Sequence, residues 1–340
     1  MAKININFVP MDISACGYYR IINVAEVLQS IKDNTGALPK YQVSIASCGK
    51  FDYTKQDYIF TQRIAGTNNI NTLLNLKKQT GVKFIVDYDD IVWAELPKYN
   101  KCAINWADNY KSMKEHLNEL VDIVTVSTES LKQSLSEFVD AHKIHVIPNM
   151  IPRFKWNYNR RPLPTNDHIL YAGSPTHFDN TTNHYGDFTN EWDKFLSTKT
   201  VNIMGICPWF VKENNHYNWT DMLSYSHNFY DIASNNKYII APLAENFFNK
   251  CKSDLKYLEC CAVGRVCICT DFDDSPYNYA HPLQKVPVRV TAKQLEYIFK
   301  QCDEHYEEIV QYQYEYLNKR LLENNIGMYE ELIKPDKLKV

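Results

Sequence analysis

The sequence predicts an α/β protein made of two Rossmann-like domains that face each other across a cleft. Strand and helix patterns alternate along both halves of the 340-residue chain, most strand segments are apolar on both faces, and a proline-rich segment divides the halves. We expect an N-terminal domain over 1–150, a linker over 151–166, a C-terminal domain over 167–310, and a final helix over 311–340 that returns to the N-terminal domain.

The first half alternates short apolar runs with segments of helical spacing. Its predicted strands cover 3–10, 41–47, 57–63, 82–90, 122–128 and 143–149. Its predicted helices cover 17–31, 69–81, 108–120 and 129–139, the second of them closed by Gly81.

The linker "IPRFKWNYNRRPLPTN" has three prolines, no acidic residue and no periodicity. After it, the predicted strands cover 168–174, 200–206, 237–243 and 266–272. Predicted helices lie at 188–197, near 224–234, at 253–263 and over about 292–325, where Gly327 is expected to break the helical pattern.

Composition restricts the partners of the protein. With 37 basic and 40 acidic residues the formal charge is −3, so nucleic acid or membrane binding has to come from a local patch. No apolar run approaches the ~18 residues of a membrane span, and the chain opens on a strand pattern with no secretion signal. We therefore expect a cytoplasmic, reducing location, with the cysteines of 251–269 as packing residues. Nothing in the sequence indicates the oligomeric state.

Two such domains place a ligand in the cleft, at the carboxyl ends of the strands. The sequence contains no G-x-G-x-x-G and no G-x-x-x-x-G-K-[ST]. These absences argue against a dinucleotide-dependent dehydrogenase and against a P-loop enzyme.

The helix predicted at 253–263 has charged residues on one face, although its end is apolar. Ser253 is the expected N-cap and Gly264 the expected end. The charged face consists of Lys252, Lys256 and Glu259. One interpretation is a solvated stripe with a Lys256–Glu259 pair worth ~0.2–0.5 kcal/mol. In the other, the helix N-terminus, Ser253 and the lysines bind phosphate while Glu259 accepts hydrogen bonds from a ribose.

This unit resembles the donor-binding segment of GT-B glycosyltransferases, in the branch related to glycosyltransferase family 4. In "KSDLKYLECCAVGRVCICTD" (252–271), Glu259 matches the glutamate that contacts the donor ribose in that family. "LYAGSPTHFDN" (170–180) is similar to the "G-S-P-T-H" turn of bacteriophage-encoded members, and "VDYDDIVW" (86–93) to their acid-rich strand end. The resemblance implies a nucleotide-sugar co-substrate, a UDP-sugar above all, no metal or other cofactor, and retention of anomeric configuration.

The sequence departs from the family pattern at two places. The position of a second, sugar-contacting glutamate holds Cys251, so either Glu245 or Asp254 substitutes or the sugar is held differently. The basic residues that usually follow the first strand of the second domain are also replaced. The candidate contacts for the diphosphate or sugar at that turn are Gly173, Ser174, Thr176 and His177.

Other candidate site residues follow strand ends. Asp89 and Asp90, in "DYDD", are expected to face acceptor or sugar hydroxyls, the alternatives being a divalent metal site or a solvated loop. In "CGYYRI", Gly17 permits close backbone approach and Arg20 is a candidate for phosphate or acceptor anion, the alternative being an exposed first-turn arginine. His177 completes the catalytic candidates.

The linker combines basic with aromatic residues, a composition suited to a nucleic-acid backbone with exposed bases. The residues concerned are Arg153, Lys155, Trp156, Arg160 and Arg161. An interdomain hinge whose aromatics pack on both domains explains the same residues.

Bacteriophage enzymes of the resembled class glycosylate 5-hydroxymethylcytosine in DNA, so double-stranded DNA is the favoured acceptor; reaching the base there requires flipping it, at a cost of a few kcal/mol. The alternatives are a cell-surface glycan, a lipid-linked sugar or a protein as acceptor, a non-catalytic nucleotide-sugar- or DNA-binding protein, and a purely structural protein.

Overall fold

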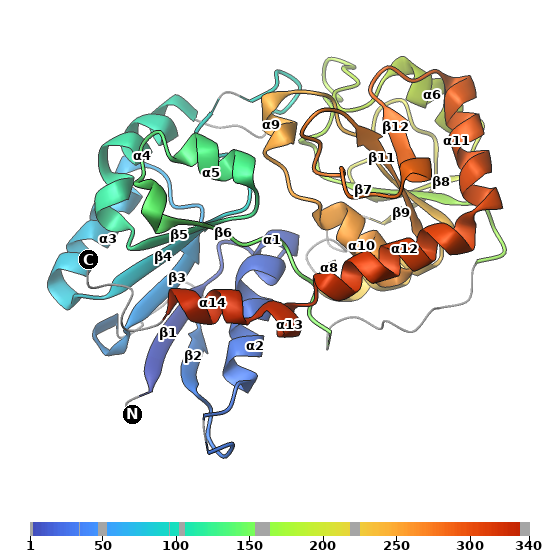
Figure 1. Ribbon diagram of the computed structural model, residues 1–340. Coiled ribbons are helices and arrows are strands. Elements are labelled where there is room, and N and C mark those ends of the chain that lie inside the picture. The colour runs from blue at the N-terminus through green and yellow to red at the C-terminus, as the bar shows by residue number, and fades with distance from the viewer. Residues whose placement is uncertain are drawn as a thin grey trace.

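The computed structural model describes residues 3–33, 35–46, 53–94, 96–101, 106–153, 164–217 and 225–333. Within these residues the chain forms two parallel sheets of six strands each, which confirms the predicted α/β class (Figure 1). The first sheet has the order β2-β1-β3-β4-β5-β6 and the second β12-β11-β10-β7-β8-β9. We call each sheet with its helices the N-terminal and the C-terminal domain.

The strands of the first sheet are β1 (Ile4–Val9), β2 (Tyr41–Ile45), β3 (Tyr58–Gln62), β4 (Lys83–Tyr88), β5 (Ile123–Val126) and β6 (Ile144–Val146). Those of the second are β7 (Ile169–Gly173), β8 (Val201–Gly205), β9 (Glu213–Tyr217), β10 (Tyr238–Ala241), β11 (Val266–Asp271) and β12 (Lys285–Pro287). The parallel register pairs, for example, Ile85 of β4 with Ile123 of β5, and Ile239 of β10 with Cys267 of β11.

Helices cover both faces of each sheet (Figure 1). Those of the N-terminal domain are α1 (Ala15–Gly17), the π-helical η1 (Tyr18–Ile22), α2 (Asn23–Ser30), η2 (Tyr53–Lys55), α3 (Thr67–Thr80), α4 (Trp106–Leu120), α5 (Glu129–Leu135) and η3 (Ala141–Lys143). After β7 follow α6 (Asn190–Leu196), α8 (Tyr225–Ser234), α9 (Phe247–Lys250), α10 (Leu255–Val263), η4 (Pro282–Gln284), α11 (Ala292–Glu304), α12 (Tyr306–Lys319), α13 (Leu322–Asn325) and α14 (Gly327–Leu332). No described helix is both long enough and apolar enough to cross a membrane.

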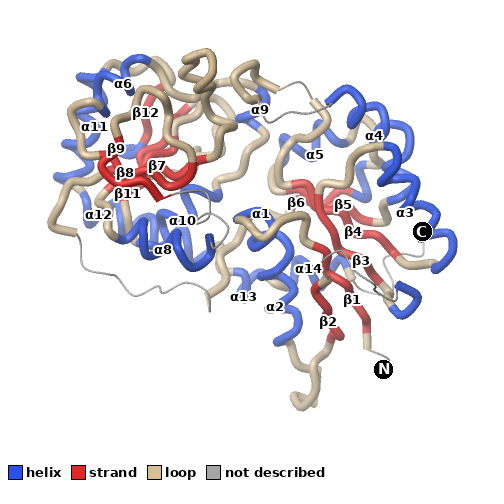
Figure 2. The backbone as a smooth tube through the Cα atoms, turned by 180° about the vertical axis from the view of Figure 1, so that it is seen from behind, coloured by secondary structure: helices blue, strands red, loops and turns tan. Residues whose placement is uncertain are grey.

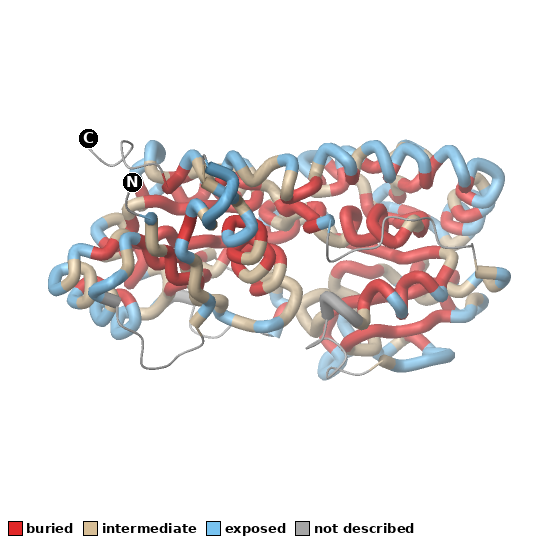
Figure 3. The backbone as a smooth tube through the Cα atoms, turned by 90° about the horizontal axis from the view of Figure 1, so that it is seen from below, coloured by how far each residue is buried: buried red, intermediate tan, exposed pale blue. Residues whose placement is uncertain are grey.

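Burial on both faces explains why the strand segments are continuously apolar. Phe84, Ile85 and Val86 of β4 are all fully buried, and Phe84 and Val86 belong to one core cluster while Ile85 belongs to another. The backbone inside both domains is coloured as buried over much of its length (Figure 3). Gly81 ends α3 in the left-handed conformation, as its position after the helical pattern predicts.

Four elements differ from the prediction. The edge strands β9 and β12 were not predicted, because β9 ("ENNHY") is polar and mostly exposed and β12 has only three residues. The predicted helix over 292–325 is broken at His305 and at Arg320, where the chain leaves helical backbone angles. Gly327 was expected to end the helical pattern, yet it begins α14.

The C-terminal segment crosses back to the N-terminal domain beside the outgoing chain. The N–H of Ile151 donates to the carbonyl of Arg320, and the N–H of Leu322 donates to the carbonyl of Ile151, both at 3.0 Å. Beyond this crossing α13 and α14 lie against the N-terminal domain, and Leu322 and Tyr329 enter its core (Figure 2).

Candidate active site

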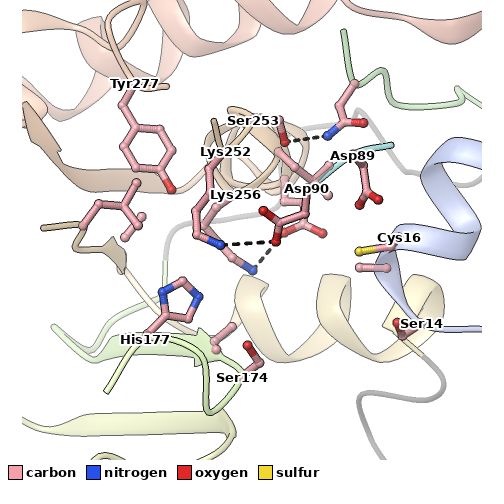
Figure 4. A pocket seen from close by; sticks show the side chains of 18 of the residues that line it. Ser14, Cys16, Asp89, Asp90, Ser174, His177, Lys252, Ser253, Lys256 and Tyr277 are labelled. Atoms are coloured by element: carbon pink, nitrogen blue, oxygen red, sulfur yellow. Dashed lines mark hydrogen bonds and ion pairs between the residues drawn. The ribbon is translucent and has the colours of Figure 1, made fainter. Parts of the chain in front are cut away.

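A cavity of about 260 Å³ lies between the two domains, where the carboxyl ends of both sheets meet. The second sheet reverses its order between β7 and β10, and Gly173 and Leu243, at and just beyond the ends of those strands, line the cavity. Such reversal points are where doubly wound sheets bind ligands. Side chains that follow β3 and β4 line the opposite wall (Figure 4).

Helix α10 contributes the charged wall. Its residues in the cavity lining include Lys256 and Glu259, and Lys252 and Ser253 line the cavity just before it begins. Gly264 ends the helix in the left-handed conformation, as predicted. Ser253 is not the N-cap: Asp254 holds that position, and the Ser253 hydroxyl instead accepts a hydrogen bond from the Asn149 amide of the N-terminal domain at 2.7 Å.

The charged residues of α10 do not form a solvated stripe. Glu259 is 1% exposed, and its Oε2 lies 3.0 Å from the Lys256 ammonium group. Lys252 lies over the ring of Phe248, at 4.3 Å from its centre, and reaches Oδ2 of Asp90 at 3.7 Å across the domain boundary. Both lysines therefore bury their stems and hold their charge in the cavity wall.

The residues of the turn after β7 line two different cavities. Gly173, Ser174 and His177 line the interdomain cavity, whereas Thr176 lines a neighbouring one and is hydrogen-bonded to Ser174 at 2.7 Å. Nδ1 of His177 lies 2.7 Å from Oδ2 of Asp187, a carboxylate that is itself buried. Because an ionised carboxylate only accepts hydrogen bonds, this contact directs the Nδ1 proton toward Asp187.

Asp89 is already paired within the N-terminal domain. Arg63 donates from Nε and Nη2 to its two oxygens at 2.7 and 2.8 Å, and Nη2 also lies 3.1 Å from the sulfur of Cys16. Burial alone would raise the pKa of Asp89, but the charge and hydrogen bonds of Arg63 outweigh it and lower the pKa. Arg63 has a φ of 46°, a strained value for a residue with a side chain, and it lines the cavity.

The second cavity, about 290 Å³, shares Arg63 and Asp90 with the first. The rest of its lining combines apolar side chains with a few amide and hydroxyl groups. They include Met11, Ile91, Asn100, Asn109, Thr176 and Phe248. Asp90 is thus the carboxylate that both cavities reach.

Arg20 and Gly17 do not have the predicted positions. Arg20 is fully buried rather than exposed, and it donates to both oxygens of Asp87 and, at 2.6 Å, to the carbonyl of Ile147. Gly17 lines neither cavity; a Cβ there would lie 1.8 Å from the carbonyl oxygen of Asp12, so its role is tight packing of the turn. Both residues build the N-terminal domain instead of binding a ligand.

The sugar-contact position also differs from the expectation. Cys251 is fully buried and packs in the core of the N-terminal domain beside Phe248. Neither suggested substitute lines the cavity: Glu245 pairs with Lys250, and Asp254 with Arg320. Of the residues in the turn after β7, Gly173, Ser174 and His177 line the cavity.

The linker residues Lys155, Trp156, Arg160 and Arg161 lie outside the described residues. Arg153 is exposed, and its backbone N–H donates to Glu323 at 2.7 Å.

The "DYDD" carboxylates have cationic protein partners: Arg20 for Asp87, Arg63 for Asp89 and Lys252 for Asp90. Among the residues that the structure describes, no cluster of three His, Cys, Asp or Glu side chains is arranged to hold a metal ion.

The sequence alone missed Arg63, Asp187 and Asn149. Arg63 carried a usable signal, a basic residue at the carboxyl end of a parallel strand. Asp187 and Asn149 had none, because their partners His177 and Ser253 lie 10 and 104 positions away in the chain.

No protein-family model matches the sequence, and no curated protein matches it at a significant level. Solved structures do match. A glycosyltransferase from Rickettsia africae ESF-5 has a TM-score of 0.60 at 16% identity, over 99% of this chain and 100% of that one. Anabaena Alr3699/HepE in complex with UDP-glucose scores 0.60 at 9% identity, over 97% and 99%. A sucrose-phosphate synthase from Thermosynechococcus elongatus scores 0.58 at 11% identity, over 97% and 98%. These likenesses, with the two facing parallel sheets, show that the chain has the GT-B fold.

Proposed function

We propose that this protein is a glycosyltransferase that moves a sugar from a nucleoside diphosphate sugar, a UDP-sugar above all, to an acceptor hydroxyl. The observation that carries the proposal is the wall formed by α10. Two lysines and a buried glutamate face one interdomain cavity there, beside the first N–H groups of the helix. This arrangement suits a diphosphate at Lys252 and Lys256 and a ribose at Glu259.

The structural relatives support the same donor. Anabaena Alr3699/HepE has been solved with UDP and with UDP-glucose, and its fold matches this chain over nearly its whole length. The sequence "KSDLKYLECCAVG" resembles the donor segment of family-4-related enzymes at the same helix.

The residues of the cavity have separate roles in this reaction. The bond between the anomeric carbon and the diphosphate oxygen breaks, a bond to the acceptor oxygen forms, and the acceptor proton is released. Lys252, Lys256 and the N-terminus of α10 stabilise the negative charge that develops on the leaving diphosphate. Asp90 accepts a hydrogen bond from the acceptor hydroxyl, since it is reached from the second cavity. The family resemblance favours retention of configuration.

The acceptor proposal is 5-hydroxymethylcytosine in bacteriophage DNA. It rests on the "G-S-P-T-H" turn and on the basic and aromatic residues of the linker, of which Arg153 is exposed. The second cavity adds two amide side chains, Asn100 and Asn109, and such groups pair well with the edge of a base. The alternative acceptors are a glycan, a lipid-linked sugar or a protein. The alternative to catalysis is a protein that binds a nucleotide sugar or DNA without turnover.

The test is release of nucleoside diphosphate from a panel of nucleotide sugars. Each donor is assayed with hydroxymethylated DNA, with unmodified DNA, with a lipid-linked sugar and without acceptor. We expect release with a UDP-sugar that requires hydroxymethylated DNA and is lost in Glu259→Ala. Release with another acceptor rejects only the DNA proposal. If no donor releases nucleoside diphosphate, and Glu259→Ala binds the nucleotide sugars as the wild type does, the glycosyltransferase proposal is rejected.

A further inference from the structure

The loop between His177 and Asp187 folds back on itself. Asp179 and His184 exchange two backbone hydrogen bonds of 3.0 Å, and the N–H of Asp187 donates to the carbonyl of His177 at 2.8 Å. Gly186 makes this return possible: it has a φ of 66°, and a Cβ there would lie 2.1 Å from the His177 oxygen. The sequence of the loop therefore brings Asp187 beside the histidine of the cavity.

Asp187 is a buried carboxylate with four donors around it. Nδ1 of His177 lies 2.7 Å from Oδ2, while Oδ1 accepts from the Asn249 amide at 2.6 Å and from the N–H of Ala244 at 3.0 Å. The fourth donor is the hydroxyl of Tyr99, at 2.6 Å from Oδ1. A carboxylate with this many fixed donors cannot rotate, so the ring of His177 is held as well.

Tyr99 reaches Asp187 from the other domain. It follows β4 in the N-terminal domain, stacks on the ring of His184 and is almost fully buried. Burial, and after it the charge of Asp187, raises the pKa of Tyr99, so the hydroxyl keeps the proton that it donates. Two residues on, Lys101 lies 3.3 Å from the carboxylate of Asp179. The same two loops therefore meet at three points across the domain boundary.

We propose that Asp187 is a positioning residue that directs Nε2 of His177 into the cavity, and that Tyr99 completes this arrangement only when the two domains are docked. The inference rests on the proposed function, because the nucleotide-sugar donor of that function is the ligand that His177 would contact in the cavity. His177 Nδ1 donates to Asp187, and Nε2 is the ring nitrogen that hydrogen-bonds the donor sugar or its diphosphate. The ring of His177 lies at the cavity (Figure 4). No covalent bond to His177 forms or breaks.

The hydroxyl of Tyr99 couples docking of the two domains to the positioning of His177. Tyr99 belongs to the N-terminal domain, whereas Asn249 and Ala244 lie between β10 and β11 in the same half of the chain as Asp187, so separation of the two sheets removes the Tyr99 contact first. Oδ1 then loses a charge-assisted hydrogen bond, which is stronger than one between two neutral groups. His177 is thus held most firmly in the docked state, in which both walls of the cavity are present.

The test is a double-mutant cycle between Tyr99→Phe and His177→Ala, with Tyr185→Phe as the matched control. Tyr185 also donates to a carboxylate, that of Asp193 at 2.9 Å, but it does not reach His177. We expect Tyr99→Phe to lower kcat/KM about 10-fold, while its unfolding midpoint equals that of Tyr185→Phe. Added to His177→Ala, the same substitution should cause no further loss of kcat/KM. A loss that is the same in both backgrounds, or no loss beyond that of Tyr185→Phe, overturns the coupling.

A spectroscopic measurement tests the positioning apart from activity. In protein labelled with ¹⁵N-histidine, the signal assigned through His177→Gln should report a proton on Nδ1. Asp187→Asn should shift that signal toward the other tautomer. An unchanged spectrum in Asp187→Asn overturns the proposal. If wild-type protein releases no nucleoside diphosphate, the proposed function fails. The spectrum still shows whether Asp187 holds the proton of His177 on Nδ1.

Discussion

The ammonium group of Lys256 lies 3.0 Å from Glu259, and the glutamate is enclosed in the cavity wall. A charge this deeply buried is kept only where it has partners, and here a partner is a lysine that also lines the cavity. The pair therefore belongs to the site, although its i,i+3 spacing is also that of an ordinary surface pair.

Replacing Glu259 by glutamine should weaken donor binding. The amide keeps the shape of the side chain but loses the charge that faces Lys256 and accepts from a ribose. We expect the dissociation constant for the nucleotide to rise about 10-fold in calorimetry. Glu296→Gln is the control, because Glu296 pairs with Lys199 at 2.8 Å outside both cavities. Equal affinities in the two variants would contradict the ribose contact.

Lys252→Met should affect catalysis more than folding. Methionine keeps the stem that packs on Phe248 and removes the charge beside Asp90. We expect kcat/KM to fall about 100-fold, the cost of losing one preorganised contact to developing charge. Lys250→Met, two positions away and outside both cavities, should stay within about twofold of wild type. A similar loss in both variants would show that general charge, and not this position, matters.

Gly186→Ala should destabilise the protein more than Gly81→Ala does. Both glycines have a positive φ, of 66° and 72°, so both variants strain the backbone by about 1 kcal/mol. Only at Gly186 does the new Cβ meet backbone, 2.1 Å from the His177 oxygen; at Gly81 nothing lies within 4 Å. We expect a further ~1–3 kcal/mol from overpacking, measured by denaturant unfolding. Equal losses would mean that the 177–187 loop shifts freely.

Arg20→Met should cost about 3–5 kcal/mol of unfolding free energy, because it leaves the buried carboxylate of Asp87 without its cation. Denaturant unfolding measures the loss. Arg20→Met combined with Asp87→Leu should recover part of the stability, since no uncompensated charge remains. A loss below about 1 kcal/mol in the single variant would contradict a structural role for this pair.

The thiol of Cys207 should react slowly at neutral pH despite its partial exposure. Burial, with a contribution from Glu213, raises the pKa of Cys207 to about 12. The thiolate is the reactive form, so the alkylation rate should rise about tenfold per pH unit from pH 8 to pH 10. Peptide-resolved mass spectrometry measures this rate, with urea-unfolded protein as the control. A plateau near pH 9 in the folded protein would contradict the raised pKa.

The repeating pattern of apolar strands and amphipathic helices was enough to predict both sheets. It failed at the two edge strands of the second sheet, since β9 is mostly exposed and carries no apolar signal and β12 has only three residues. It also missed the break at Arg320, where the chain pairs with Ile151. Within the site, α10 was predicted because the apolar residues Leu255, Leu258 and Ala262 recur at helical spacing before Gly264. Arg20 was misplaced because a buried ion pair with Asp87, 67 positions away, has no local signature.

The return of the chain across the boundary limits how far the domains are modular. Leu322, Tyr329 and Leu332 follow the entire C-terminal domain in sequence, yet they fill the core of the N-terminal one. A chimera that joins residues 1–150 to a foreign partner would expose the surface they cover, at about 1.5–3 kcal/mol for each side chain. That sum is a large part of the stability of an ordinary domain. Recombination between proteins with this chain path therefore has to exchange an interior segment and keep both ends of the chain from one parent.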